Sequence, residues 1–196
     1  MENTKLKELY QNVTQWAKEK GLDHQEAKDG LLKVCEETGE VCDAIISANQ
    51  ADMEDALGDL MVTVINFTNE LPLDTLKILQ LGLSEAEKHT FSSLQSMANH
   101  LSVSSFSAFK IVSNTQAISS MLMRNTKEEQ SHLAEIKHRL QDIVMFASIL
   151  AKLSELDILQ CLTTAYNVIS KRTGKMVNGV FVKSEDLKNG IDNQNN

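Results

Sequence analysis

The chain is poor in the residues that interrupt helices. Its 196 residues include one proline and eight glycines, while hydrophobic residues make up 42% and charged residues 23%. Because proline and glycine are the strongest helix breakers, this composition favours an all-α fold, which we expect to be a helical bundle. The hydrophobic and charged fractions are typical of a globular protein, and the length suffices for one ordinary domain or two small ones.

Positive charge is also in deficit. The chain has 19 basic against 27 acidic residues and a net charge of −8. Without a large basic footprint, we expect no nucleic-acid partner, and a phosphate-bearing ligand would need a divalent metal to offset the acid. No apolar run approaches 18 residues and the first ten residues, MENTKLKELY, are charged, so we expect neither a membrane span nor a signal peptide.

Cysteine is scarce too. Cys35 and Cys42 are seven residues apart on one predicted helix, about 10 Å along its axis, which is too far for a disulfide. With Cys161 the count is odd. We therefore expect reduced thiols and a cytoplasmic protein.

Apolar residues recur at helical spacing along most of the chain. The predicted helices cover about residues 3–20, 24–48, 51–70, 74–97, 104–124, 127–153 and 155–172. The serine-rich segment 102–107 is the best candidate for an internal boundary. Residues 175–183 break the helical pattern, and Asn178-Gly179 between β-prone residues predicts a short C-terminal β-hairpin.

The two halves of the chain resemble each other. At an offset of 83 positions, seven residues of the first half meet identical residues of the second, and the pairs include Leu57 with Leu140 and Asp59 with Asp142. Chance alignment of leucine-rich helices is one explanation, and duplication is the other. Duplication would divide the chain into units 1–100 and 101–174, followed by a hairpin and tail at 175–196.

Carboxylates crowd into two places that are otherwise apolar and helical. The first cluster is Glu36, Glu37 and Glu40, and the second is Asp55 and Asp59. Residues three or four apart share a helix face, and a short connector should make the two helices antiparallel, so the clusters can face each other. Like charges near an apolar core are costly unless a divalent cation such as Mg²⁺ binds them. The alternative is a solvated acidic helix face.

Two further observations help to decide between a metal site and a solvated acidic face. Gly39 and Gly58 each lie in a predicted helix interior beside a carboxylate, which fits close helix approach at a site or simple packing. At an offset of 77 the three glutamates meet Ser113, Asn114 and Ala117. The second half would thus be a copy that kept the helices and lost the acids.

These motifs resemble a known family. EETGE at 36–40 followed by DALGD at 55–59 is similar to the E-E-x-x-E and E-x-x-D signature of the MazG-like all-α nucleoside triphosphate pyrophosphohydrolases. Segments 15–22 and 165–183 resemble the two ends of short phage-type members. The resemblance covers most of 1–90 and 155–183. It implies MazG-like four-helix units in tandem, the second degenerate.

The resemblance also implies roles for individual residues. Glu37, Glu40, Asp55 and Asp59 would bind Mg²⁺, or Mn²⁺ in its place, and Glu36 would complete the shell or orient the attacking water. Asp55 departs from the pattern, because the usual acid lies one position later, at Ala56. The residues expected to contact substrate are Lys33, Asn66, Trp16, Lys171, Arg172 and Lys175. The alternative role of Trp16 is packing in the core. The alternative role of the basic C-terminal residues is a favourable interaction with the negative end of the helix dipole.

The implied function is hydrolysis of a nucleoside triphosphate between the α and β phosphates, giving a monophosphate and pyrophosphate. The competing hypothesis is a non-catalytic helical module that senses nucleotides or binds a partner. A di-iron bundle needs two Glu-x-x-His motifs, and only Glu135–His138 matches. By resemblance to family members that assemble as dimers or tetramers, we expect a homo-oligomer, a dimer of pseudo-dimeric chains.

Overall fold

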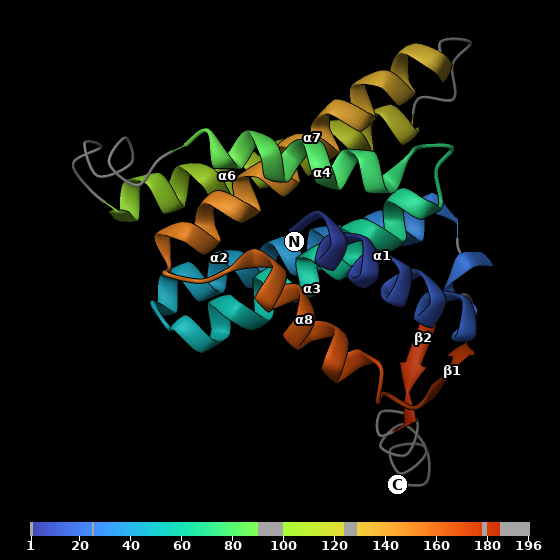
Figure 1. Cartoon of the computed structure of the whole chain (residues 1–196). Coiled ribbons are helices and arrows are strands. Elements are labelled where there is room, and N and C mark those ends of the chain that lie inside the picture. The colour runs from blue at the N-terminus through green and yellow to red at the C-terminus, as the bar shows by residue number, and fades with distance from the viewer. Residues whose placement is uncertain (1, 25, 90–99, 124–128, 178–179, 185–196) are drawn as a thin grey trace, which may run out of the picture.

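The computed structural model describes residues 2–24, 26–89, 100–123, 129–177 and 180–184. It is an all-α bundle with one short hairpin (Figure 1). In chain order its elements are α1 (Glu2–Glu19), the 3₁₀-helix η1 (Leu22–His24), α2 (Ala27–Ser47), α3 (Gln50–Asn69), α4 (Thr75–Glu87), α6 (His100–Met123), α7 (Glu129–Leu153), α8 (Ile158–Ile169), β1 (Gly174–Val177) and β2 (Val180–Lys183). The predicted fold class is confirmed.

Side-chain caps fix where three of these helices begin. Asn49 accepts hydrogen bonds from the backbone N–H groups of Ala51 and Asp52 at the start of α3. Asp74 and Asp157 each accept one from the N–H three residues later, at the starts of α4 and α8. These caps satisfy N–H groups that a helix start leaves without an intrahelical partner. The two aspartates are also one of the identical pairs of the sequence repeat.

The serine-rich segment 102–107 lies within a helix and does not form a connector between helices. These residues lie inside α6, and Ser107, Ala108 and Ile111 on that helix are buried. Serine costs a helix interior only a fraction of a kcal/mol, which burial of an apolar face easily offsets. The end of α4 was also predicted too late, because the helix ends at Glu87 and residues 90–99 lie outside the described part of the chain.

The halves of the chain exchange helices. Each half contributes an antiparallel pair, α2 with α3 and α6 with α7, and α2 packs against α6. Helix α3 of the first half packs on α8 of the second, and α7 of the second half packs on α4 of the first. One hydrophobic core therefore draws buried side chains from α1, α2, α3, α4, α6, α7 and α8. The predicted division into tandem units stays a prediction, but the described halves do not have separate cores.

A glycine allows close approach at each of the two contacts between the halves, α3 with α8 and α4 with α7. A Cβ on Gly58 of α3 would lie 2.5 Å from the Cys161 carbonyl oxygen of α8. A Cβ on Gly82 of α4 would lie 2.7 Å from the Val144 side chain of α7. Both distances are shorter than real Cβ contacts, so only glycine fits without movement of the neighbouring helix. Gly39, by contrast, has nothing within 4 Å, and the expectation that it marks a helix contact is wrong.

The described part of the chain ends just after the predicted hairpin. Strands β1 and β2 pair antiparallel, with Gly174 opposite Lys183 and Val177 opposite Val180. Its turn, Asn178-Gly179, lies outside the described residues. Among those described, no helix is long and apolar enough to cross a membrane.

Candidate functional site

The acidic residues lie on α2 and α3, which a two-residue connector at 48–49 holds side by side. The buried face of α2 comprises Gly30, Leu31, Val34, Glu37, Thr38, Val41 and Ala44. Glu37 is therefore a carboxylate at a core-facing position of the helical repeat. At the other end of the pair, Gly30 of α2 lies against the carboxyl of Glu70, the residue that follows α3, and a Cβ on Gly30 would collide with it.

Glu37 is the most unusual of the predicted metal ligands. It is only 6% exposed, and its Oε2 has no hydrogen-bond partner. Its Oε1 lies 3.2 Å from the Lys33 ammonium. Burial raises the pKa of Glu37 to about 7; Lys33 opposes the rise, and the negative charges of Glu40 and Asp59 add to it. A buried carboxylate oxygen without a partner is costly, which is the state a bound cation would relieve.

Asp59 faces the same acidic region from α3. Burial raises the pKa of its carboxyl, the cation of Arg172 opposes that effect, and the charges of Asp55 and Glu40 reinforce it. The Arg172 Nη2 lies 3.8 Å from Asp59 Oδ2. Arg172 follows α8, so the exchanged packing of α8 on α3 brings a cation from the far end of the sequence to the acids.

The other predicted acids are more open. Glu36, Glu40 and Asp55 are exposed, and Glu36 accepts a 2.5 Å hydrogen bond from Lys33. Lys33 thus lies between Glu36 and Glu37 and neutralises part of their charge. Over the described part of the chain, no three His, Cys, Asp or Glu side chains are arranged closely enough to hold a metal as they stand.

The residues predicted to contact substrate lie in different environments. Asn66 is partly buried, and its Oδ1 has no hydrogen-bond partner. Trp16 belongs to the hydrophobic core at 8% exposure, which does not favour stacking on a base. Lys171 is exposed next to Arg172, and the side chain of Lys175 lies outside the described residues. The structure therefore brings Lys33 and Arg172, but not Trp16, to the acids.

In the second half a different network occupies the corresponding positions. Asn114, the counterpart of Glu37, is 2% exposed, and its Oδ1 accepts a 3.2 Å hydrogen bond from Arg139. Arg139 also pairs with Glu135, with Nη2 and Oε1 2.6 Å apart. Arg139 thus places positive charge beside Asn114, whereas the counterpart of Asn114 in the first half is the buried acid Glu37. The second half has no unpartnered carboxylate at this position.

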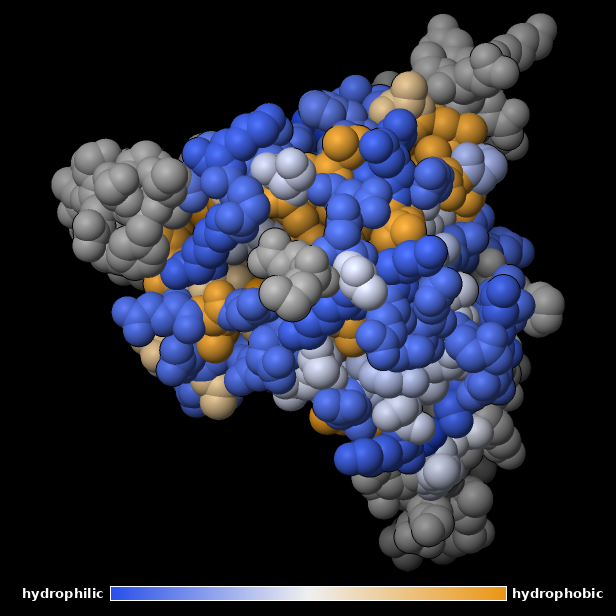
Figure 2. Space-filling model, viewed as in Figure 1, coloured by the Kyte–Doolittle hydropathy of each residue, from blue (hydrophilic) through white to orange (hydrophobic). Residues whose placement is uncertain are grey.

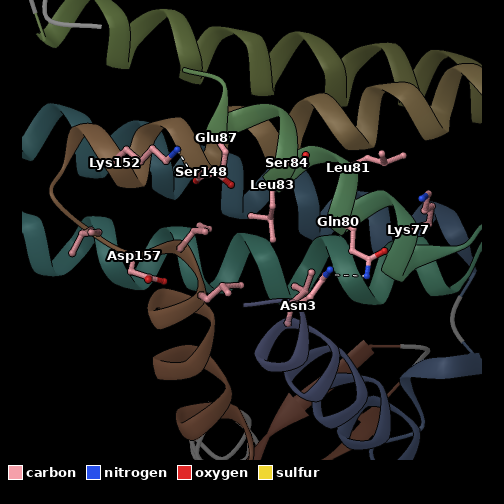
Figure 3. Close-up of a pocket in the computed structure, with 14 residues that line it drawn as sticks. Asn3, Lys77, Gln80, Leu81, Leu83, Ser84, Glu87, Ser148, Lys152 and Asp157 are labelled. Carbon is pink, nitrogen blue, oxygen red and sulfur yellow. Dashed lines mark hydrogen bonds and ion pairs between the residues drawn. The ribbon is translucent and has the colours of Figure 1, made fainter. Parts of the chain in front are cut away.

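Side chains of the described residues line two cavities that bear on the site. The larger, of about 750 Å³, lies between α1, α4, α7 and the start of α8, and none of the predicted site residues lines it (Figure 3). Four of its polar side chains are paired: Gln80 donates to Asn3 at 3.1 Å, and Lys152 lies 2.7 Å from Glu87. On this face apolar patches show between polar side chains (Figure 2). The smaller cavity, of about 240 Å³, includes Asn66 in its lining.

One lining residue of the smaller cavity was missed in the sequence. Glu70 follows Asn66 by four residues on the same face of α3, and burial followed by the charge of Asp29 raises its pKa to about 8. The available signal was its spacing from Asn66. The four-residue interval alone does not distinguish such a carboxyl from an exposed one.

The fold and site together define an all-α bundle whose acidic residues gather on one antiparallel helix pair. Residues 25–80, which include both acidic motifs, match the model of the MazG nucleotide pyrophosphohydrolase domain, and this segment belongs to that family. The predicted resemblance is confirmed for residues 25–80, and its extension to residues 1–24 and 155–183 stays a prediction. No curated protein and no solved structure matches the chain.

Proposed function

We propose that the chain is a metal-dependent nucleoside triphosphate pyrophosphohydrolase that cleaves between the α and β phosphates. Membership of the MazG family indicates nucleotide pyrophosphohydrolase activity in general. The observation that carries the finer assignment is Glu37, a buried carboxylate with an unpartnered oxygen, facing the charges of Glu40 and Asp59. A folded protein keeps such a group when a ligand completes it.

The donor set fits a hard divalent cation. Glu37, Glu40, Asp55 and Asp59 offer only oxygen, which Mg²⁺ or Mn²⁺ prefers, and we propose these four as the metal ligands. When bound, the metal would neutralise triphosphate charge and lower the pKa of the attacking water. The exposed Glu40 and Asp55 side chains are free to turn toward the buried Glu37 when the site fills.

The neighbouring residues supply charge and orientation. Lys33 and Arg172 carry the cations nearest the acids, and we propose that they bind phosphate oxygens and release Glu37 and Asp59 in doing so. Glu36 keeps an exposed carboxylate beside Lys33 and is suited to orient the attacking water. The chain's own contribution is then mainly positioning and electrostatics.

The test is pyrophosphate release with Mg²⁺ from a panel of nucleoside triphosphates. Glu40→Gln and Asp59→Asn are expected to lower kcat by at least about a hundredfold while circular dichroism stays unchanged. The matched control is Asp142→Asn, the counterpart of Asp59 in the second half, which should retain activity. Full metal-dependent turnover by both site variants would overturn the proposal, and binding without turnover in the native chain would favour a sensor.

The assembly follows from the same reasoning. Since each half completes the packing of the other, we propose that one chain corresponds to a dimer of simpler units and that two chains pair again. Light scattering at several concentrations measures the mass of the assembly directly.

A further inference from the structure

Two contacting helices expose large apolar side chains to solvent. Six large hydrophobic side chains of the described residues are exposed, and four of the six lie on α2 and α6: Leu32 (67%), Ile46 (82%), Phe109 (67%) and Val112 (42%). The two helices pack on each other. Single exposed apolar side chains are common on protein surfaces, whereas a group of them on neighbouring helices is typical of an interaction site.

The sequence repeat relates the two sets of residues. At the offset of 77 positions, Leu32 meets Phe109 and Cys35 meets Val112. Both members of each pair are exposed. Since the same two helical positions are apolar and exposed in both halves, the surface is a property of the repeated helical unit.

On each helix these residues share one side. Leu32 and Cys35 are three residues apart, and Ile46 follows Leu32 by fourteen, close to four helical turns, so they lie along about 21 Å of α2. Phe109 and Val112 are likewise three residues apart on α6. We call these five residues the outer stripe.

The two helices differ in charge, which bears on what can cover them. Helix α2 carries five acidic and two basic residues, and the acids Glu36, Glu40 and Asp43 are exposed. Helix α6 carries no acid, and its one lysine is Lys110. A second α2 against α2 would bring acids together, whereas an α6 against α2 would bring a helix without negative charge.

We propose that the outer stripe is the interface between two copies of this chain, with α2 of each copy against α6 of the other. This inference rests on the pairing of two chains in the proposed function and names the surface that forms it. In a dimer with two-fold symmetry each contact occurs twice, so the exposed residues of both helices are covered together.

The interface would border the acidic site. Lys33 and Glu36 directly follow Leu32 and Cys35 along α2, so the second copy would lie beside residues proposed to act on the nucleotide. For this reason the assembly is measured without nucleotide, and its outcome does not depend on hydrolysis.

The test is light scattering after size exclusion, at several concentrations and with a reducing agent to prevent disulfides. The native chain is expected at twice its chain mass of 21.8 kDa. Leu32→Glu and Phe109→Glu should each give the mass of one chain with unchanged circular dichroism. Leu81→Glu is the matched control, since Leu81 is 40% exposed on α4 and should leave the dimer intact. A native chain that stays monomeric, or a dimer that withstands either stripe variant, would overturn the proposal.

Two opposite charges at one position test which helices meet. If α6 faces the acidic α2, a lysine at the position of Phe109 is attracted and a glutamate is repelled. The dissociation constant of the dimer should therefore be at least about tenfold lower for Phe109→Lys than for Phe109→Glu. Equal constants for the two variants would contradict the contact between α2 and α6.

Pyrophosphate release separates this proposal from the proposed hydrolysis. If the chain hydrolyses a triphosphate and the stripe variants leave its mass unchanged, the interface is overturned and the hydrolysis stands. If no triphosphate is hydrolysed, the hydrolysis fails, and the mass measurements still decide the interface.

Discussion

A single helical position shows how the two halves differ in chemistry. Glu37 and Asn114 are counterparts in the repeat, and both are buried. Asn114 is neutral; its Oδ1 accepts a hydrogen bond from Arg139, and its Nδ2 has no partner. Glu37 has an unpartnered carboxyl oxygen and a raised pKa. Since the same frame accommodates a neutral side chain there, folding does not require the acid. We attribute the acid to binding.

Glu70 gives a pH dependence that can be measured in the absence of ligand. Its pKa is raised from the ordinary 4.5 to about 8 in the folded chain, so between these values the folded state binds more protons than the unfolded state. The contribution of Glu70 to the free energy of unfolding therefore falls as pH rises from about 4.5, and the loss is complete above about 8.

We expect Glu70→Gln to remove that decline. Urea denaturation of the native chain and the variant at pH 5, 7 and 9 should show the variant gaining relative stability, by roughly 1–3 kcal/mol at pH 9. Glu87→Gln, on an exposed side chain, is the control. A constant difference between the native chain and Glu70→Gln across this range would contradict the buried state of the Glu70 carboxyl.

At the scale of elements, two glycines that look alike in the sequence have different surroundings. Both lie inside helices next to acidic residues. The space beside Gly58 is occupied by Cys161 and Ala165 of α8, and the space beside Gly39 is open to 4 Å. Only the first glycine is needed for helix packing.

The two alanine substitutions should therefore have opposite effects. Gly58→Ala is expected to destabilise the chain by about 1–3 kcal/mol, because the Cβ forces α8 away from α3. Gly39→Ala should stabilise it by about 0.5–1 kcal/mol, since it lowers the entropy cost of the helix without a clash. Thermal denaturation of the two variants measures both effects, and a stabilising Gly58→Ala would contradict the close α3–α8 contact.

For the whole molecule, the exchange of helices makes each half depend on the other. Without the second half, α3 loses α8 and α4 loses α7, which uncovers part of the hydrophobic core that the two halves share. Exposed apolar area of that kind is costly at about 25 cal/mol per Å². The first half should not persist as a folded monomer.

A fragment of residues 1–89 tests this dependence. Alone it is expected to be poorly helical or to self-associate, and mixing with a fragment of residues 100–184 should restore helicity and cooperative unfolding. Circular dichroism and light scattering follow both properties. A fragment 1–89 that is monomeric and unfolds cooperatively would show that the halves are independent domains.

Much of the site was predictable because it depends on local spacing. Carboxylates three and four residues apart share a helix face whatever the tertiary structure, so Glu37, Glu40, Asp55 and Asp59 could be grouped from the sequence. The cap at Asp74 and the hairpin after Gly174 are local in the same way. Glu70 could not be found, because its pKa depends on burial by α1 and α2.

The sequence by itself determined the helices, the hairpin, the acidic pair of helices and the family of residues 25–80. Only the tertiary structure decided that α8 crosses α3 at Gly58, that Arg172 approaches Asp59, and that Asn66 and Glu70 have buried oxygens without a partner. The physical reason is the separation in sequence over which each interaction acts. Helical periodicity and capping act within a few residues, whereas burial and charge proximity arise from segments as distant as α3 and α8.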